Sequence, residues 1–555
     1  MGGALSKMTR NIGNKNLLFA YILLALLSVL PYLNASQGEF VWDDTAFYVD
    51  NPAFTSDPNV GRFFLTSVWQ QSKLQTKDPL YRPVFLTSMW VNQKLFGSNA
   101  FAHHLFSIGL HLAATLMLFS LLRRLLTDSG VLPALAGALV FAIHPIHVEA
   151  VAWISAYGHV MATFLLLAAM HCYLRNIDNM AVYWLGLSLI LFAAALLTLE
   201  IAVAFPLLLT AYEYLRFRHI RLRRVVPFWI MLALYFAIRK GVLHEMTPLD
   251  MSSLSGWRTG LSFAMAYVEY LFIPWPQLVY AAVPESGIVT PSGGALTLVL
   301  GAAILALFRL QVPQKWLLIF GVVWIALTLV APIVAAFTPR PLFALRTLYL
   351  PSVGISILAA WMVAVPLRSH RSAALAGLSL LIMAAVPATF MANRDWLVHT
   401  KVYEKILSVT PGALGTALSL AEEYEKQGDA PAAERVLLQA ADYAQDDTSR
   451  ITLYERLGLL YGIRGAITQS EQYYKKVLEL TPNRSSAWVG LGNNAWARED
   501  FPAALNAYLT AERADSTNYE AIYNSALVYG RLGNQSKAIE YFQRASALKQ
   551  SKGGG

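Results

Sequence analysis

Long apolar runs separated by short basic segments dominate the first 392 residues of this chain. A helix needs about 20 predominantly apolar residues to cross a bilayer, and these runs reach or approach that length. Only 14% of the residues are charged and 56% are hydrophobic, whereas roughly a quarter of a soluble domain is charged. The sequence therefore predicts an all-α polytopic membrane region with about eleven transmembrane helices. The expected spans are residues 17–33, 101–122, 131–149, 158–174, 181–199, 201–215, 225–240, 295–309, 316–337, 345–366 and 372–392.

One further apolar stretch, residues 261–276, is interrupted by Glu269, Pro274 and Pro276. A charge and two prolines are costly in a spanning helix, so we expect this stretch to be interfacial or re-entrant. We assign it, with the eleven spans, to a membrane domain at residues 1–398.

Basic residues fix the expected orientation, because cytoplasmic loops carry an excess of Lys and Arg. Lys7, Arg10 and Lys15 precede the first span, and the densest basic cluster lies at residues 216–224. If the interrupted stretch does not cross, these and the later basic loops all fall on the cytoplasmic side. The long first loop, residues 34–100, and the C-terminal region then face outward.

The net charge of +9 follows from this topology, because the arginines cluster between spans, and it gives no reason to expect nucleic-acid binding. Cys172 is the single cysteine and lies in an apolar run, so no disulfide framework is expected. These features suit a bacterial inner membrane protein whose outer face lies in the periplasm. In a eukaryote that face would lie in a lumen.

A 34-residue period follows the membrane region: an aromatic or aliphatic position at Tyr454 recurs at Trp488 and Ile522. Small residues recur where two helices must approach, and large ones recur where units meet, which is the tetratricopeptide pattern. We expect about four repeats at residues 399–550, on the external side, with a concave face that can hold a peptide. Residues 551–555 are interpreted as a tail or tag.

An acidic pair, Asp43-Asp44, lies in the first external loop close to the bilayer. Adjacent carboxylates are costly to desolvate and repel each other, so such a pair indicates chemistry or ion binding more than packing. A divalent cation is one ligand it could hold. An alternative is a helix cap, in which Asp44-Thr45 begins a helix at Ala46.

The membrane region resembles the GT-C class of glycosyltransferases. It is most similar to the transmembrane and tetratricopeptide-repeat protein O-mannosyltransferases and their bacterial relatives. The matching stretches are Phe40-Val-Trp-Asp-Asp44 with Asn51-Pro52, Tyr81-Arg-Pro83, Leu95-Phe-Gly97 with His104 and His111, Phe141-Ala-Ile-His-Pro-Ile-His-Val-Glu149, Ala152-Trp-Ile-Ser155, and Arg346-Thr-Leu-Tyr-Leu-Pro-Ser-Val-Gly354.

This resemblance implies transfer of a sugar, mannose by default, from a polyprenyl-phosphate donor to a hydroxyl with inversion at the anomeric carbon. The acceptor would be Ser or Thr of an exported protein presented by the repeats. Transfer to a hydroxyl needs a base near the acceptor oxygen, and Asp43 is the candidate. Asp44 would tune its pKa, orient the acceptor or bind a metal.

The leaving phosphate needs compensating positive charge on the same face. Arg346 begins a span at its external end, where a guanidinium could bind phosphate in a bidentate manner. Arg82 and Arg239 are further candidates, and for all three the alternative is snorkelling at the interface.

Several other polar residues fall on the external face. His144, His147 and Glu149 resemble a metal cluster, but histidines three apart with a proline between them do not match the usual i, i+4 ligand spacing. We therefore expect contacts with the donor phosphate or sugar, together with Tyr349. The remaining cavity candidates are Glu200, His104 and His159, whereas His111 is interpreted as a buried structural histidine.

This chain departs from its relatives in two places. They tend to carry an Arg and an acid after Ser155, where this chain has Ala156-Tyr157-Gly158-His159, and a Lys where it has Leu199. Both losses alter the charge near the presumed donor site and leave the sugar open.

Two other functions compete with protein glycosylation. The first keeps the donor but modifies a lipid or surface glycan, with the repeats docking a partner enzyme. The second is non-enzymatic, as an assembly scaffold or transporter subunit. Scattered external acids and arginines, without a charged path through the membrane, argue against a transporter.

Overall fold

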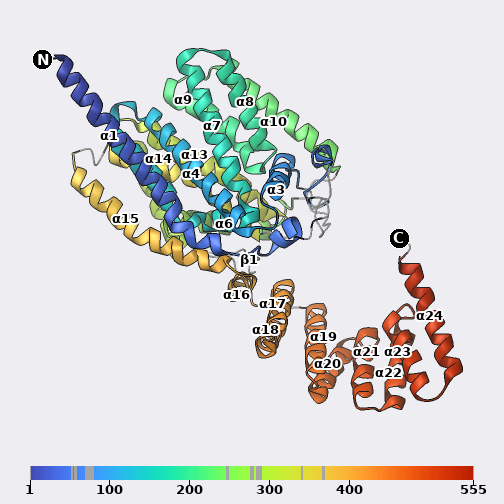
Figure 1. The fold of residues 1–555 in the computed structure, drawn as a ribbon. Coiled ribbons are helices and arrows are strands. Elements are labelled where there is room, and N and C mark those ends of the chain that lie inside the picture. Colours follow the sequence, from blue (N-terminus) through green and yellow to red (C-terminus); the bar gives the residue numbers. More distant parts are fainter. Residues whose placement is uncertain are drawn as a thin grey trace. The chain divides into compact units, whose positions relative to one another are not determined.

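The computed structural model divides the chain into two compact units, Met1–Lys405 and Ile406–Gly555, and Figure 1 shows the helices of each. The sequence placed this boundary at residue 398. Parts of the first external loop and of the stretch 261–276 lie outside the described residues, as do the last two residues of the tail. The described residues are 2–49, 51, 54, 59–68, 70, 80–244, 249–274, 281–282, 291–309, 311–338, 342–365, 369–444 and 446–553.

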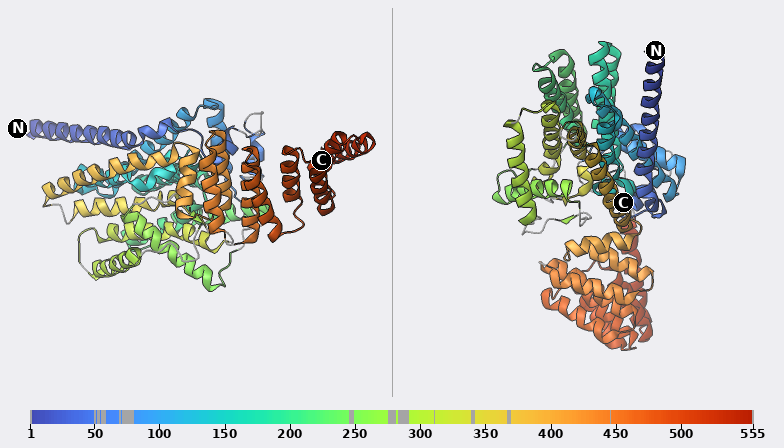
Figure 2. Two further views of the ribbon diagram at one scale, coloured as in Figure 1. Left: turned by 90° about the horizontal axis from the view of Figure 1, so that it is seen from below. Right: turned by 90° about the vertical axis from the view of Figure 1, so that its left-hand side faces the viewer.

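The first unit is a bundle of helices that run side by side, as Figure 2 shows. One antiparallel pair of two-residue strands, β1 (Ala281–Ala282) and β2 (Leu342–Phe343), joins two of its loops. The helices are α1 (Gly2–Val29), α3 (Pro83–Phe96), α4 (Ala100–Leu125), α5 (Val131–Ile143), α6 (Val148–Ala152), α7 (Gly158–Asn179), α8 (Val182–Leu196), α9 (Phe205–Phe217), α10 (Leu222–Leu243), α11 (Leu254–Phe272), α12 (Pro291–Arg309), α13 (Lys315–Val334), α14 (Ser352–Ala364) and α15 (Arg371–Ala392).

Among the described residues, six helical segments are long and apolar enough to cross a membrane, or seven if one bent pair is a single span. The expected count of eleven therefore stays a prediction, and three shorter apolar helices accompany the six. The interrupted stretch 261–276 lies largely in α11, which is not among the six. The six segments are Lys15–Gln37, Ala100–Leu125, Ile154–Asn179, Leu222–Leu243, Lys315–Phe337 and Arg371–Trp396.

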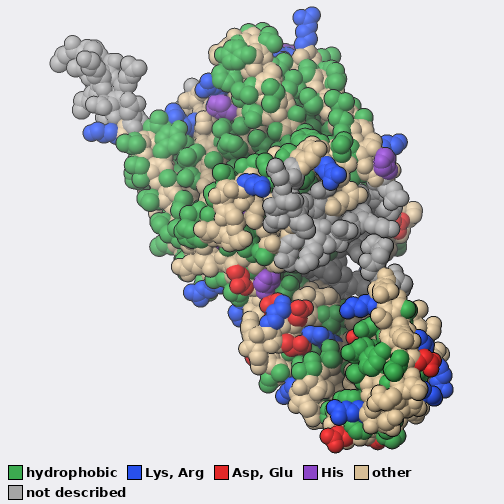
Figure 3. Space-filling model, turned by 45° about the vertical axis from the view of Figure 1, so that its right-hand side comes forward, with side chains coloured by type: hydrophobic (Ala, Val, Ile, Leu, Met, Phe, Trp, Pro, Cys, Tyr) green, Lys and Arg blue, Asp and Glu red, His purple; other side chains and the backbone are tan. Residues whose placement is uncertain are grey.

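The surface of the first unit fits a lipid environment. Large apolar side chains lie exposed on several of its helices, including Ile190 at 66% and Ile230 at 62%. Figure 3 shows hydrophobic side chains covering much of this unit, whereas charged side chains are frequent on the repeat unit. Because such a large apolar surface is costly in water, the helices indicate a multi-pass membrane protein, as the sequence predicted.

A break in one apolar segment positions polar residues. α5 and the segment Pro145–Ala152 meet at an angle of 48°. His144 takes an extended backbone conformation there, because a residue before proline is disfavoured in the helical region. Its Nδ1 accepts a hydrogen bond from the N–H of Ile146 at 3.3 Å, which starts the short 3-10 helix Pro145–His147.

The second unit consists of antiparallel helix pairs, and the all-α fold with C-terminal repeats is confirmed. Its packing follows the repeat pattern: a Cβ added to Gly458 would meet the Tyr474 ring at 2.9 Å, and one added to Gly490 would also clash with this ring. Thus small residues admit the large ones of the neighbouring helix. The helices are α17 (Leu414–Lys426), α18 (Ala430–Tyr443), α19 (Asp447–Ile463), α20 (Ile467–Leu480), α21 (Ser485–Ala497), α22 (Phe501–Ala514), α23 (Tyr519–Arg531) and α24 (Gln535–Gly553), preceded by α16 (His399–Val409).

Candidate functional site

The two carboxylates of the acidic pair have different environments. Asp44 is fully buried, and its Oδ1 accepts hydrogen bonds from the backbone N–H of Ser155 at 2.7 Å and from the Ser155 hydroxyl. Its Oδ2 accepts a hydrogen bond from the N–H of Val41 at 3.1 Å. The side chain thus bonds back to a residue three positions earlier, as the acid of a capping box does, and not forward as the predicted cap would. Asp44 fastens the first external loop to the segment after α6.

Asp43 is half-buried, and among the described residues none donates a hydrogen bond to its carboxylate. Burial raises its pKa to about 6, although the positive charge of Arg346 opposes the shift. Burial also raises the pKa of Asp44 to about 7, against the hydrogen bonds from Ser155 and Val41. Asp43 is therefore the member of the pair whose oxygens remain available to a bound molecule, with a pKa in the range suited to a general base.

Arg346 is held by Glu149 at the start of the 3-10 helix Leu345–Leu348. Its backbone N–H donates to Glu149 Oε2 at 3.0 Å, and its guanidinium forms an ion pair with Oε1 of the same carboxylate. Glu149 is 2% exposed. The guanidinium also lies 5.0 Å from the centre of the Trp153 ring, a cation–π distance. Arg346 is thus fixed on three sides with its charge acting on Asp43.

A second ion pair lies between Arg82 and Glu200. Arg82 Nε donates to Glu200 Oε2 at 2.9 Å, and its terminal nitrogen lies 2.8 Å from the same oxygen. Burial would raise the pKa of Glu200, but the charge and hydrogen bonds of Arg82, with the charge of Arg239, lower it below its ordinary value. Its carboxylate is therefore ionised at neutral pH.

His159 connects the two pairs electrostatically, because it lies within range of the charges of both Arg346 and Arg82. Its Nδ1 lies 3.2 Å from the carbonyl oxygen of Ala156. Three of the predicted donor-site and cavity residues are thus brought into one neighbourhood, and Arg239 reaches it through Glu200.

The two histidines of the broken helix lie elsewhere. His144 Nε2 is 3.2 Å from the Leu271 carbonyl oxygen, and His147 Nε2 is 2.8 Å from the Ser352 hydroxyl. The ring of Tyr349 lies 4.4 Å from that of His147, and its hydroxyl is 2.7 Å from His111 Nδ1. These predicted donor-binding residues cluster with His111, all of them buried except the partly buried His144, and the hydrogen-bond partners named here are protein groups.

His104 is also buried, at 1% exposure, and lies against the backbone of the first external loop. A Cβ added to Gly38 would meet its Nε2 at 3.0 Å, so the loop approaches the ring closely there. His104 therefore supports the start of the loop that carries the acidic pair.

Within the part of the chain that the structure describes, no three His, Cys, Asp or Glu side chains are grouped so that they could hold a metal ion. A divalent cation at the acidic pair would have Asp43 and Asp44 as its ligands. One of those carboxylates is already bound by Ser155.

Comparison with known proteins gives relatives that share one description. The chain is 26% identical over 415 residues to the protein O-mannosyl-transferase F38B6.6 of Caenorhabditis elegans, which covers 72% of this chain and 59% of that protein. It is 34% identical over 197 residues to human protein O-mannosyl-transferase TMTC1, covering 33% and 22%, and 20% identical over 612 residues to human TMTC3, covering 93% and 66%.

The resemblance to this family is confirmed. The tetratricopeptide repeat family model also matches, at residues 451–484 and 519–552. The chain spans less than two thirds of the length of these curated relatives.

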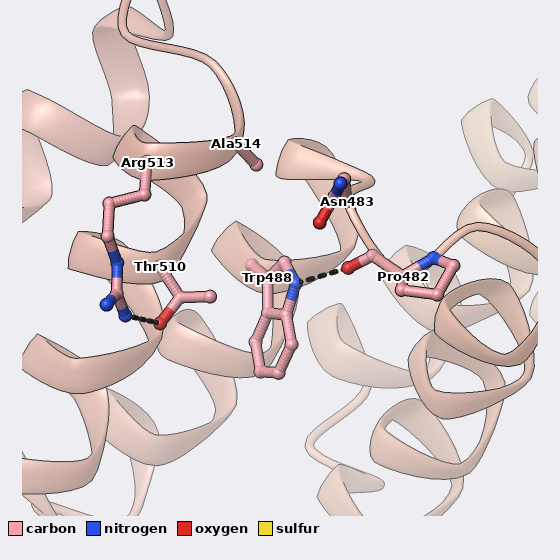
Figure 4. A pocket seen from close by; sticks show the side chains of 6 residues that line it. All are labelled: Pro482, Asn483, Trp488, Thr510, Arg513 and Ala514. Atoms are coloured by element: carbon pink, nitrogen blue, oxygen red, sulfur yellow. Dashed lines mark hydrogen bonds between the residues drawn. The ribbon is translucent and has the colours of Figure 1, made fainter.

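The repeat unit contains a hollow of about 360 Å³ between two neighbouring repeats, drawn in Figure 4. The Trp488 indole donates to the Pro482 carbonyl oxygen at 3.0 Å, and Arg513 donates to the Thr510 hydroxyl at 2.8 Å. Its remaining lining residues are Asn483 and Ala514. An aromatic ring beside a cation and an amide suits a short polar segment of polypeptide.

Sequence reasoning missed the groups that fasten the acidic loop. Ser155, Trp153 and Trp396 were not proposed as site residues, although the first two lie in a stretch shared with the relatives. Trp153 stacks on Trp42 with ring centres 5.0 Å apart and on Trp396 at 5.4 Å. The three tryptophans lie more than one hundred residues apart in the sequence. No local pattern therefore indicates that they stack together beside Arg346.

Proposed function

We propose that this chain is a membrane glycosyltransferase that moves mannose from a polyprenyl-phosphate donor to Ser or Thr of an exported protein, with inversion. The observation that carries the proposal is the unequal acidic pair. Asp44 is fastened by Ser155 and Val41, whereas the Asp43 carboxylate accepts no hydrogen bond from the described residues and feels the charge of Arg346. The names of the relatives support the reaction class and the acceptor class.

In the proposed reaction Asp43 takes the proton of the acceptor hydroxyl as its oxygen attacks the anomeric carbon. The bond from that carbon to the phosphate oxygen breaks, and its electron pair leaves with the polyprenyl phosphate. Attack opposite the leaving group inverts the configuration in one displacement. A base with a pKa near 6 is ionised at neutral pH, yet it is more basic than an ordinary carboxylate.

Arg346 and Arg82 supply the positive charge for the leaving phosphate in this scheme. Each is positioned by a carboxylate, Glu149 or Glu200, so little side-chain entropy is lost when the phosphate arrives. His159 lies in range of both, and we assign it to the wall between them. Arg239 adds charge beside Glu200.

The first unit, Met1–Lys405, here called the membrane unit, would perform the transfer, and the repeats would present the acceptor. The hollow beside Trp488 supports a peptide contact, and tetratricopeptide repeats form concave binding surfaces in general. The basic loops support an orientation in which Asp43 and the repeats face the periplasm of a bacterium or the lumen of a eukaryotic compartment.

The test is turnover of the purified full chain with polyprenyl-phosphate mannose and a Ser/Thr-rich peptide. Asp43→Asn keeps the shape of the side chain but removes the base, and we expect a loss of at least two orders of magnitude in kcat. Asp178→Asn is the matched control, because Asp178 is 60% exposed and pairs with Arg124 away from the acidic pair.

Full activity of a folded Asp43→Asn protein would refute the base assignment. Transfer to a lipid or glycan but to no peptide would refute a protein acceptor and favour an enzyme that modifies a lipid or surface glycan. Deleting residues 406–553 then separates the units: loss of peptide transfer with retention of transfer to a small alcohol supports presentation by the repeats.

A further inference from the structure

A set of aromatic and backbone contacts joins the loop of the acidic pair to the end of the membrane unit. Trp42, which directly precedes Asp43, has φ of +55°, in the left-handed region that non-glycine residues rarely adopt. Such a conformation costs free energy and persists only where surrounding contacts determine it. The contacts that hold Trp42 therefore fix the direction in which the next side chain, Asp43, points.

One of these contacts comes directly from the segment that leads into the repeats, and that segment also reaches Trp42 indirectly, through Trp153. The N–H of Trp42 donates to His399 Nδ1 at 3.3 Å. The indole of Trp42 stacks on Trp153, and Trp153 stacks on Trp396, with both pairs inclined by 16°. Trp396 is 2% exposed and ends the 3-10 helix Asn393–Trp396, and His399 is the first residue of α16.

Two hydrogen bonds hold the start of the first external loop, at Glu39, beside the segment 397–399. The N–H of Glu39 donates to the Leu397 carbonyl oxygen at 3.0 Å, and the N–H of His399 donates to Glu39 Oε1 at 3.1 Å. These bonds hold the backbone of His399 beside the loop, and the ring itself bonds to the N–H of Trp42. All of these residues belong to the first unit, and the chain passes to the repeats a few residues later.

From this geometry we infer that Trp396 and His399 are positioning residues for Asp43, so that the junction before the repeats forms a wall of the site. His399 acts as a hydrogen-bond acceptor for a strained backbone N–H, and Trp396 backs the tryptophan stack over which the Arg346 guanidinium lies. The inference rests on the proposed function, because it concerns the orientation of the Asp43 side chain, the proposed base.

The first test compares two substitutions of His399. His399→Asn offers an amide oxygen near the place of Nδ1 and should keep a hydrogen-bond acceptor for the Trp42 N–H. His399→Phe keeps a ring but has no acceptor, and a shift of about 1 Å in the reacting group can cost on the order of a hundredfold in rate. We expect kcat to fall tenfold or more in His399→Phe with KM for the donor unchanged, and to be largely retained in His399→Asn.

The control is His370→Phe, because His370 is an exposed histidine at the start of α15. Trp396→Phe, which keeps an aromatic ring, should retain more kcat than Trp396→Leu. Equal losses in His399→Phe and His399→Asn, or unchanged kcat in a folded His399→Phe protein, would overturn the inference.

A second measurement does not depend on any reaction. In a Cys172→Ala background, which removes the single and buried native thiol, Asp43→Cys places one thiol at the proposed base position. Its labelling rate with a maleimide should rise several-fold when His399→Phe is added, and should stay constant with His399→Asn or His370→Phe. If the unmodified chain transfers no sugar, the proposed function fails while this measurement still decides the positioning. An unchanged labelling rate in His399→Phe would refute the positioning alone.

Discussion

The polar contacts that build the site in the membrane unit join residues that lie much farther apart in the sequence than those joined by the ion pairs of the repeat unit. In the membrane unit, the contacts that build the site join residues separated by 111, 118 and 197 positions. In the repeat unit, three of the ion pairs between helices join residues separated by 29 to 31 positions, about one repeat. The pairs are Asp44–Ser155, Arg82–Glu200 and Glu149–Arg346 in the first unit, and Arg484–Glu455, Arg464–Glu434 and Arg456–Glu425 in the second.

This difference predicts how damage spreads. A repeat array is stabilised by the folding of each repeat and by its packing against the neighbouring repeats, so a lost contact weakens the array locally. A site assembled from distant segments has no such redundancy, because each contact orients groups from two parts of the bundle. Changes in the first unit should therefore alter activity, and changes in the second should alter local stability with little effect on the chemistry.

The largest effect should come from Glu149→Gln. It removes the buried charge that pairs with the Arg346 guanidinium, and breaking a buried pair typically costs about 3–5 kcal/mol. We expect at least a hundredfold loss of kcat/KM, measured with the purified chain, and a lower melting midpoint of the membrane unit. Asp178→Asn serves again as the exposed control. Activity close to that of the unsubstituted protein would remove Glu149 from the site.

A smaller and local effect is expected from Gly490→Ala. The added Cβ would clash with the Tyr474 ring, and overpacking a core typically costs about 1–3 kcal/mol. Gly530→Ala is the matched control in the next repeat, because nothing lies within 4 Å of its added Cβ. Hydrogen exchange should show faster opening of helices α19 to α22 only in Gly490→Ala, while transfer to a small alcohol stays constant. Loss of that transfer would break the comparison between the units.

Acid should reduce activity before it affects the repeats. The proposed base acts when ionised, and its pKa is raised to about 6, so kcat should be highest above this value and fall as pH decreases through it. At pH 5 we expect about a tenth of the plateau rate. In the repeat unit, hydrogen bonds from Ser449 lower the pKa of Asp446, so this acid stays ionised over the same range. A rate that does not change between pH 5 and 8 would contradict an Asp43 base.

The smallest effect is expected from Arg484→Ala. Arg484 pairs with Glu455, but its side chain is 46% exposed, and exposed ion pairs contribute about 0–1 kcal/mol. The melting midpoint of the repeats should move by a few degrees at most, with unchanged kcat. A loss as large as that of Gly490→Ala would show that the ion pairs between repeats matter more than their packing.

The same difference in reach explains what could be predicted from the sequence. The repeats were found because their period places equivalent residues at a fixed step, as Tyr454 and Trp488 show. Most membrane helices were found because a bilayer demands long apolar runs, although α11 and the short helices leave the number of crossings open. The acidic pair stands out in the sequence because two adjacent carboxylates near a membrane are costly, and its role stays a prediction.

The partners of the site residues could not be predicted in the same way. Nothing local in the sequence indicates that Ser155 binds Asp44, or that Glu149 pairs with Arg346. His144 and Glu149 are close in sequence, yet the break at Pro145 directs one to Leu271 and the other to Arg346. Such choices depend on how distant helices pack, and a single sequence contains no period or spacing that reports this.

Contacts that repeat at a step of one unit also make the array easy to lengthen or shorten in evolution. Duplicating a segment of about 34 residues copies both halves of an ion pair such as Arg484–Glu455, so the new junction is complementary as soon as it arises. The segment whose His399 bonds to Trp42, the residue before Asp43, precedes the first repeat, and it would be untouched by such a duplication. Repeat arrays of different length can thus follow one membrane unit by gene duplication alone, without any compensating substitution near the acidic pair.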